Sequence, residues 1–400
     1  MVYLHVPFCR SFCTYCDFYS EIACRGRDAQ SFELYAQALC AEASRRQDEI
    51  AATRDLNTLY VGGGTPSVLP PALLRRMLAP LMTGGDPFTE FTIEVNPEDI
   101  VEKGVDYVRE LLALGVNRVS MGVQSLDDGI LRWMNRRHDA ARARQAFGIL
   151  REAGVRNISI DLIFGISQLS EAIFAETLRE VLAWRPEHVS AYQLSIEDGS
   201  ALAQLVRQGH YSEAPQEQCA AQYRQLCDAL RAAGYVHYEI SNWALPGREA
   251  VHNSAYWSRH PYVGLGPGAH SFDGTVRSWN AESLPPAQAA TAAENRSHPR
   301  LRKREGPASE GSGRGPAQQD VFSGSSPLRG GKEVLSEKEA KEEKVFLGLR
   351  TARGVTEDLL PKEKAAGMLS DGRLARTAEG RLRIPEDRWF VSDDIIADLL

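Results

Sequence analysis

The chain has 400 residues, of which 43% are hydrophobic and 25% charged, and its 46 Lys and Arg against 53 Asp and Glu give a net charge of −7. This composition is typical of a globular protein and excludes collagen-like, disordered and disulfide-dense chains, while the acidic balance argues against a protein dominated by nucleic-acid binding. We predict a cytoplasmic protein, because no apolar run reaches the roughly 18 residues of a membrane span and the N-terminus lacks the pattern of a signal peptide.

Short β-rich runs alternate with helical patterns through the first half of the chain. Strands that alternate with helices form parallel sheets, so the pattern predicts an α/β fold, a partial (β/α)6 TIM-like barrel. In such a barrel the loops that follow the strands form the reactive face. The predicted strands are Val2–His5, Leu56–Val61, Phe91–Val95, Arg118–Met121, Ile158–Phe164 and His188–Leu194. The predicted helices are Phe32–Ala43, Pro71–Leu81, Val105–Leu114, Ala140–Ala153 and Ala172–Trp184.

The composition divides the chain into four parts. We predict the barrel at residues 1–205 and a flanking region at 206–283. A flexible insertion rich in Pro, Gly, Ser, Ala and Arg follows at 284–335. A small winged-helix-like domain of helices and one hairpin, Leu374–Ile384, would occupy 336–400. The insertion carries a basic group that is either solvated linker charge or a docking patch: Arg300, Arg302, Lys303 and Arg304.

Three of the seven cysteines, Cys9, Cys13 and Cys16, directly follow the first predicted strand. Thiolates at this spacing can hold an iron–sulfur cluster, and three ligands on a four-iron cluster would leave one iron open. Structural zinc and incidental core cysteines are the alternatives, although structural zinc usually takes four ligands from paired motifs. The remaining cysteines show no ligand spacing and are predicted to be inert thiols: Cys24, Cys40, Cys219 and Cys227.

This cysteine motif resembles the signature of the radical S-adenosylmethionine (SAM) superfamily. The resemblance implies a [4Fe–4S] cluster held by Cys9, Cys13 and Cys16. It further implies that the open iron binds the amino and carboxylate groups of SAM, and that reduction releases a 5′-deoxyadenosyl radical. The cofactor would supply the difficult chemistry, and the protein would orient it and exclude water.

A glycine triplet, Gly62-Gly63-Gly64, follows the second predicted strand and is itself followed by Thr65. It resembles the superfamily loop that meets the amino group of SAM, so Gly63, Gly64 and Thr65 would line the cofactor. Glu94, at the end of the third strand, resembles the superfamily contact to the ribose hydroxyls. From the residues alone, a tight turn is the alternative for the triplet, and a solvated acid at a strand end is the alternative for Glu94.

Further segments resemble the coproporphyrinogen dehydrogenase-like branch of that superfamily. They are Val2–Cys9, Gly122–Ser125, Met134–Arg136, Asp161–Gly165 and Ser190–Leu194. This resemblance implies that Gln124, Arg136 and Asp161 meet SAM or a second ligand of similar size. It also implies that Tyr3 and Tyr15 are aromatic residues of the adenosyl pocket. A surface ion pair is the alternative for Arg136, and simple core packing is the alternative for Tyr3.

Within this branch the chain is most similar to the HemW family of heme chaperones. Cys16-Asp17-Phe18 has the form of that family, whereas the dehydrogenase follows its third cysteine with Gly-Cys and carries an N-terminal extension before its cluster. His252–Trp257 matches the H-N-x-x-Y-W segment of the family. The resemblance covers about Val2–Phe272 and resumes near Lys344–Leu400. The run Gly165–Ser170 departs from the family pattern of Gly-Leu-Pro-x-Gln-Thr.

The resemblance implies heme as a ligand, and heme iron takes His, Met, Cys or Tyr as its axial ligand. His252 is the first candidate, with Tyr256 and Trp257 offering flat apolar surface, although a structural role for His252 is the alternative. Weaker candidates for the iron ligand are His237 and His270. Arg248 or Arg259 would be a cationic partner for the heme propionates.

Two functions remain open at this point. The first is a chaperone that binds heme and passes it to an acceptor protein, with peripheral membrane contact through a membrane-bound acceptor. The second is an enzyme that decarboxylates the propionates of coproporphyrinogen III by SAM radical chemistry. The absent fourth cysteine and N-terminal extension favour the first, and the acidic balance disfavours an RNA-modifying enzyme or any nucleic-acid partner.

Overall fold

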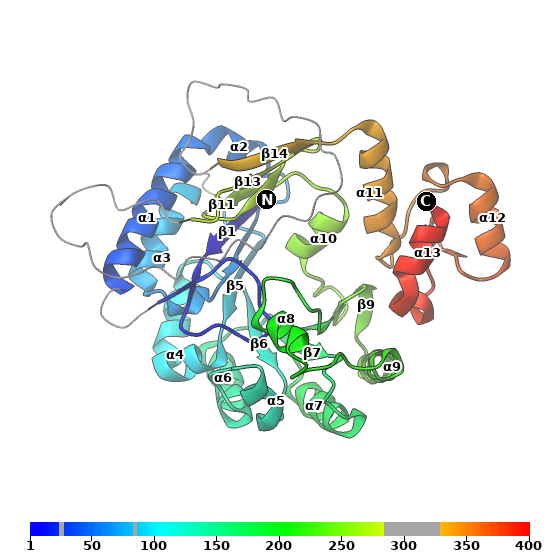
Figure 1. Ribbon diagram of the computed structural model, residues 1–400. Coiled ribbons are helices and arrows are strands. Elements are labelled where there is room, and N and C mark those ends of the chain that lie inside the picture. Colours follow the sequence, from blue (N-terminus) through cyan, green and yellow to red (C-terminus); the bar gives the residue numbers. More distant parts are fainter. Residues whose placement is uncertain (24–27, 83–85, 284–328) are drawn as a thin grey trace.

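The computed structural model describes residues 1–23, 28–82, 86–283 and 329–400. Parallel strands alternate with helices, which confirms the predicted α/β fold and its six strand–helix units (Figure 1). The strands of these units are β1 (Val2–Val6), β4 (Thr58–Gly63), β5 (Glu90–Val95), β6 (Arg118–Gln124), β7 (Ile158–Phe164) and β8 (His188–Gln193). The helices among them are α1 (Asp28–Arg45), α2 (Gln47–Ala52), α3 (Pro71–Leu78), α4 (Pro97–Ala113), α5 (Asp128–Trp133), α6 (Ala140–Ala153), α7 (Glu171–Trp184), α8 (Ala201–Arg207) and α9 (Gln216–Ala232).

Three short strands that the sequence did not predict extend this sheet to nine strands. They are β9 (Val236–Glu239), β10 (Asn242–Ala244) and β11 (Val263–Leu265). β11 pairs parallel with β1, while β10 pairs antiparallel with β8 and carries β9 at the outer edge, so the order is β11-β1-β4-β5-β6-β7-β8-β10-β9. Strands this short contain too few residues for alternation to be recognised.

A second, antiparallel sheet contains β12 (His270–Phe272), β13 (Val276–Asn280) and β14 (Arg329–Val334). The strand β14 falls inside the range predicted as a low-complexity insertion. Packing against Trp279 explains two of its glycines. A Cβ atom at Gly330 would lie 2.9 Å from the Trp279 ring, and one at Gly331 would lie 2.5 Å from it. The basic group at residues 300–304 and Cys24 lie outside the described residues.

Helix α4 begins at Pro97, eight residues before the predicted start at Val105. Proline is favoured at the first position of a helix because its missing N–H would be unpaired there anyway. Gly104, with a φ of 72°, separates a first segment of α4 from the predicted second one. The first segment carries acidic residues that matter for the site below.

The C-terminal part contains α11 (Glu337–Leu349), α12 (Lys362–Ser370), α13 (Ser392–Leu399) and the predicted hairpin, formed by β15 (Ala375–Arg376) and β16 (Leu382–Arg383). It lies at the flank of the barrel, coloured orange to red in Figure 1, near α9, β9 and α10 (Val251–Trp257). The backbone joins the two parts where Ile240 N–H donates to Arg350 C=O at 3.0 Å. None of the described helices is long and apolar enough to cross a membrane.

Candidate functional site

A cavity of about 730 Å³ opens at the carboxyl ends of the parallel strands, where barrel loops carry reactive groups. The cysteine loop after β1 and the ends of the following strands line it. The cavity brings together eleven of the predicted site residues: Cys9, Cys13, Tyr15, Cys16, Gly63, Gly64, Thr65, Glu94, Gln124, Arg136 and Asp161. Tyr3 and His252 do not line it.

Two short paired strands, β2 (Phe8–Cys9) and β3 (Glu21–Ile22), close the base of the cysteine loop. The Cys9 Sγ lies 3.5 Å from the Thr65 hydroxyl oxygen. Burial raises the pKa of the Cys9 thiol, and it raises the pKa of Cys16 to about 11. These two groups are therefore protonated near pH 7 without a cation, and metal binding must release their protons.

The three cysteines come from one short loop and line one cavity, so the residues fit an iron–sulfur cluster held by three thiolates. Structural zinc usually takes four ligands, and among the described residues these cysteines are not part of a compact group of potential zinc ligands.

The glycine loop lies directly against the backbone that precedes the first cysteine. Gly63 has a φ of 109°, which glycine adopts without strain, and a Cβ at Gly64 would lie 2.7 Å from the carbonyl oxygen of Phe8. The Gly63 N–H donates to Glu94 Oε2 at 3.1 Å, and the Tyr60 hydroxyl donates to Oε1 at 2.7 Å. The loop and the carboxylate thus form one preorganised wall of the cavity.

Arg136 and Gln124 line the same cavity. The Arg136 guanidinium donates to the Gly122 carbonyl at 2.7 Å and to Cys13 Sγ at 3.3 Å, while its buried Nε has no partner. Gln124 has a φ of 66°, a left-handed conformation that non-glycine residues rarely adopt and that is frequent at functional sites. An unpaired donor and a strained residue facing one cavity indicate a binding site for a polar ligand.

Asp161 contributes a second carboxylate to the cavity. The Ser120 hydroxyl lies 3.0 Å from Asp161 Oδ2, and the Ser159 hydroxyl lies 3.5 Å from Oδ1. Burial is the largest influence and raises the pKa of Asp161. The two serines fix the orientation of the Asp161 carboxylate on β7. Because Asp161 lines the cavity, it can make the predicted contact to a ligand there.

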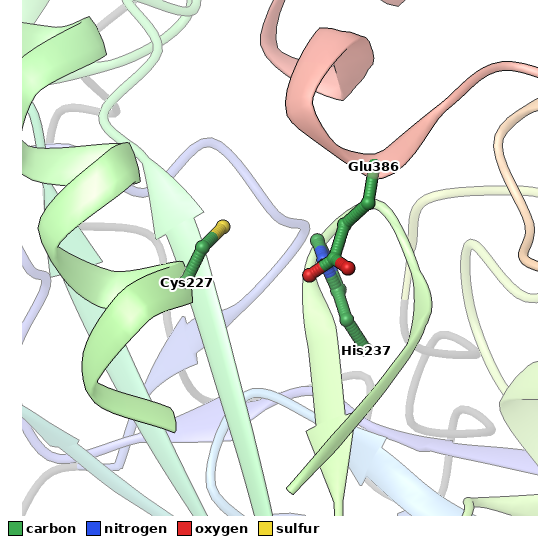
Figure 2. A group of neighbouring side chains, drawn as sticks. All are labelled: Cys227, His237 and Glu386. Atoms are coloured by element: carbon green, nitrogen blue, oxygen red, sulfur yellow. The ribbon is translucent and has the colours of Figure 1, made fainter. Parts of the chain in front are cut away.

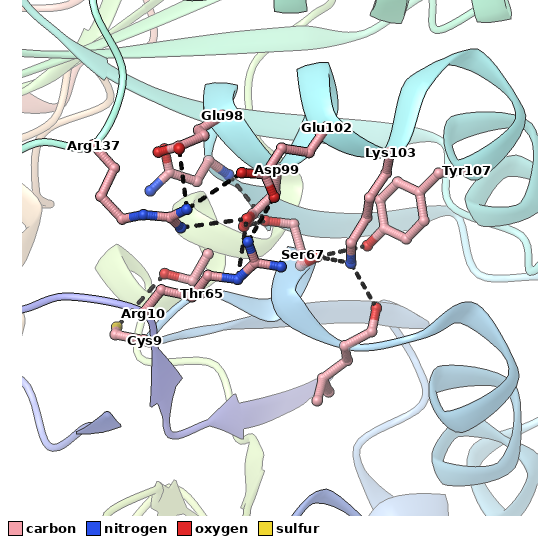
Figure 3. A network of polar contacts seen from close by, with 12 residues as sticks. Cys9, Arg10, Thr65, Ser67, Glu98, Asp99, Glu102, Lys103, Tyr107 and Arg137 are labelled. Atoms are coloured by element: carbon pink, nitrogen blue, oxygen red, sulfur yellow. Dashed lines mark hydrogen bonds and ion pairs between the residues drawn. The ribbon is translucent and has the colours of Figure 1, made fainter. Parts of the chain in front are cut away.

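An ion-pair network from the first segment of α4 holds the cysteine loop, as Figure 3 shows. Arg10 of that loop pairs with Glu102 at 2.6 Å and approaches Asp99 to 3.9 Å. Arg137, next to the cavity arginine, pairs with Glu98 at 3.1 Å and Asp99 at 3.7 Å. The sequence pattern did not reveal these positioning residues, because it predicted the start of α4 only at Val105.

Tyr3 and His252 lie outside the cavity and contact neighbouring side chains. Tyr3 contacts the ring of His5, whose Nδ1 lies 3.0 Å from the Tyr3 hydroxyl. His252 is fully buried, and its Nδ1 lies 2.9 Å from the Thr58 hydroxyl while its Nε2 lies 3.1 Å from the Tyr256 hydroxyl. Both ring nitrogens of His252 therefore lie within hydrogen-bond distance of a protein hydroxyl in this structure.

A second cavity of about 470 Å³ lies between α10, β9 and the C-terminal part. Trp257 gives it an aromatic wall. Arg259 lines it too, with Nε paired to Glu343 at 2.6 Å and a buried Nη2 that has no partner. Of the other weaker heme candidates, His237, His270 and Arg248 line neither this cavity nor the first. Further cationic residues around it are Lys344, Arg353 and Arg381.

Comparison with known proteins places these features in a family. Residues 3–181 match the family model of the radical SAM superfamily. The heme chaperone HemW of Lactococcus lactis is 31% identical over 88% of this chain and 82% of its own length. HemW of Bacillus subtilis is 35% identical over 70% of this chain and 72% of its own length, and HemW of Mycobacterium tuberculosis 32% over 95% and 92%.

Among solved structures, the coproporphyrinogen III oxidase HemN of Escherichia coli, a radical SAM enzyme, superposes with a TM-score of 0.73 over 99% of this chain and 89% of its own. At 20% identity this likeness shows a shared fold alone. The HemW relatives match at higher identity over most of both lengths. The chain therefore belongs to the HemW family of the radical SAM superfamily.

Proposed function

We propose that this chain is a heme chaperone, which binds heme and delivers it to acceptor proteins. The similarity to HemW proteins over most of the chain carries the proposal. Phe18 supports it, because this side chain stands near the cavity, 71% exposed, where the decarboxylating branch resembled by the sequence has a further cysteine. Decarboxylation of coproporphyrinogen III is the second candidate, and the sequence segments that resemble the coproporphyrinogen dehydrogenase-like branch are what favours it.

Membership of the radical SAM superfamily implies a [4Fe–4S] cluster and SAM. When bound, this pair supplies one-electron chemistry. In our proposal the three cysteines bind the cluster, and the loop from Gly63 to Thr65 approaches the amino end of SAM. Glu94 accepts hydrogen bonds from the ribose hydroxyls, and Arg136 offers its unpaired Nε to an anionic group. The barrel walls exclude water from the reactive end.

Glu94 is expected to make SAM binding depend on pH. Burial raises the pKa of its carboxyl group to about 7. Below that pH the group is neutral and accepts hydrogen bonds more weakly than the carboxylate, so affinity for SAM should rise as the pH increases through about 7. Titration calorimetry of SAM against the cluster-loaded protein between pH 6 and 8 measures this.

The matched variant for this prediction is Glu94→Gln, which keeps the shape of the side chain and removes its charge. The amino group of SAM titrates near this range as well, but equally in both proteins. Glu94→Gln should bind SAM more weakly above pH 7, and its affinity should lack the Glu94 component of the pH dependence. Identical pH profiles for both proteins would contradict the assignment.

The second cavity is the proposed heme site. The Trp257 ring offers a flat apolar face, and the unpaired Nη2 of Arg259 offers a charged donor to a propionate. The cavity borders α10, which contains the H-N-x-x-Y-W segment. We propose that buried His252, which contacts Tyr256 on the same helix, holds α10 in place rather than binding iron.

A heme titration tests both the function and this site. The full chain should bind about one heme with a shifted Soret band. Arg259→Gln should weaken binding roughly 10- to 150-fold, the equivalent of a charge-assisted hydrogen bond of about 1.5 to 3 kcal/mol. Arg248→Gln is the control, because Arg248 is exposed and lines neither cavity.

Thermal melting of both variants checks that the loss of the Arg259–Glu343 pair has not unfolded the C-terminal part. Equal heme affinity of the two variants would contradict the site, and the absence of heme binding by the unaltered chain would contradict the function. We further propose a cytoplasmic location with an acceptor protein as partner. The free thiols of the described cysteines support it, since reducing compartments keep cysteines unpaired.

A further inference from the structure

Three side chains far apart in the sequence meet at the junction between the barrel and the C-terminal part. They are Cys227 on α9, His237 on β9 and Glu386 at the start of the 3-10 helix Glu386–Val391. Figure 2 shows them pointing toward one another from these three elements. Their ligand atoms all lie within 4.8 Å of one another, and within the described part of the chain no other three Cys, His, Asp or Glu residues do so.

The contacts of His237 suggest that its ring is oriented for a ligand. Its Nδ1 lies 3.1 Å from Glu386 Oε1, and its Nε2 lies 3.4 Å from the carbonyl oxygen of Ile240. The ring stacks on Trp243 at 4.0 Å between centroids and meets Trp389 edge-on at 4.2 Å. Burial between indoles favours the neutral imidazole, which has one N–H for these two oxygen acceptors.

A cation bound at Nδ1 would remove this mismatch. The Nε2–H would then donate to the Ile240 carbonyl, the backbone contact that usually orients a metal-binding histidine. Glu386 would bind through Oε2, because both His237 and Arg231 contact its Oε1. Arg231 is 55% exposed, so its charge is largely solvated and can remain paired with that oxygen.

We propose that Cys227, His237 and Glu386 form a zinc site that fastens the C-terminal part to the barrel. Thiolate, imidazole and carboxylate are the ligands that zinc prefers. Binding releases the thiol proton of Cys227 to the solvent, and the thiolate and carboxylate then neutralise the two charges of Zn²⁺. A water molecule fills the fourth position. The site is distinct from the cluster cysteines and independent of the proposed heme function.

The experiment uses the full chain with its cluster already loaded, so that Cys9, Cys13 and Cys16 are occupied. Zinc chloride is added anaerobically, loose metal is removed by gel filtration, and zinc and iron are counted. The unaltered chain should retain about one zinc per chain. X-ray absorption at the zinc edge should show one sulfur at about 2.3 Å with nitrogen or oxygen neighbours at about 2.0–2.2 Å.

Two variants remove different ligands. Cys227→Ser and Glu386→Gln should each bind zinc at least tenfold more weakly, and Glu386→Gln alters a side chain that is only partly buried. Cys219→Ser is the matched control, because Cys219 is also buried on α9 but lies outside the group. It should retain zinc as the unaltered chain does.

Three outcomes would overturn the proposal. In the first, the unaltered chain retains no more zinc than Glu386→Gln does. In the second, the X-ray absorption spectrum shows three sulfur neighbours around zinc. In the third, Cys227→Ser and Cys219→Ser bind zinc with equal affinity. If Cys227→Ser fails to fold, as thermal melting would reveal, Glu386→Gln alone decides. None of these readouts depends on heme, so failure of the zinc site and failure of heme binding are distinguishable.

Discussion

Cys13→Ser is expected to reduce bound iron from about four atoms per chain to near zero after anaerobic reconstitution. Three cysteines are the fewest that can hold three corners of the cluster, and a serine hydroxyl is not an adequate replacement for a thiolate. Cys13 also contacts the Arg136 guanidinium at 3.3 Å, so the variant loses a second anchor of the loop. Iron analysis and the visible absorption of the cluster measure the loss.

Cys40→Ser is the control for this experiment. Cys40 lies on α1, and its Sγ donates to the Arg76 carbonyl at 3.5 Å rather than facing the cavity. This variant removes one thiol and should keep its full iron content. Full iron in Cys13→Ser would contradict the cluster assignment, and equal losses in both variants would show nonspecific iron binding by exposed thiols.

Arg136→Met is expected to weaken SAM binding by about 30-fold to several thousand-fold while iron content stays near that of the unaltered chain. Removing one partner of a buried, hydrogen-bonded charge pair costs roughly 2 to 5 kcal/mol, and each 1.4 kcal/mol is about a tenfold change in affinity. The methionine keeps much of the side-chain volume but has no donor for the ligand. Calorimetric titration with SAM, on protein of known iron content, measures the change.

The control is Arg132→Met, an exposed arginine on the adjoining α5. This variant should bind SAM as the unaltered chain does. If Arg136→Met kept both its iron and its SAM affinity, Arg136 would have the alternative role of an ion pair without a ligand contact. If it lost its iron as well, its contact with Cys13 would be the more important one.

The barrel was predictable because its signals are local. Each strand of the (β/α)6 core is a short apolar run followed by a helical stripe, and the glycine triplet and the cysteine motif occur at strand ends, where the fold brings loops together. The contact of Asp161 with a ligand was implied only by the family resemblance, and in the structure Cys9 and Asp161 line one cavity.

Other features depend on contacts that sequence spacing cannot express. The sequence offers His252 as a candidate iron ligand but does not show that Thr58 and Tyr256 lie within hydrogen-bond distance of its two ring nitrogens. Cys227 shows no ligand spacing, because its neighbour Glu386 arrives from the C-terminal part, 149 residues beyond His237. The strand β14 looked like linker because its glycines accommodate the Trp279 ring, a contact visible only in the folded chain.

In the function proposed above, the chain carries heme rather than transforming a porphyrinogen. The most direct measurement offers heme and coproporphyrinogen III together, with SAM and a reductant, to the cluster-loaded chain under anaerobic conditions, and then analyses the tetrapyrroles bound and free. We predict about one heme retained per chain and unchanged coproporphyrinogen III. Repeated conversion of coproporphyrinogen III to protoporphyrinogen IX, with no heme retained on the protein, would contradict the account.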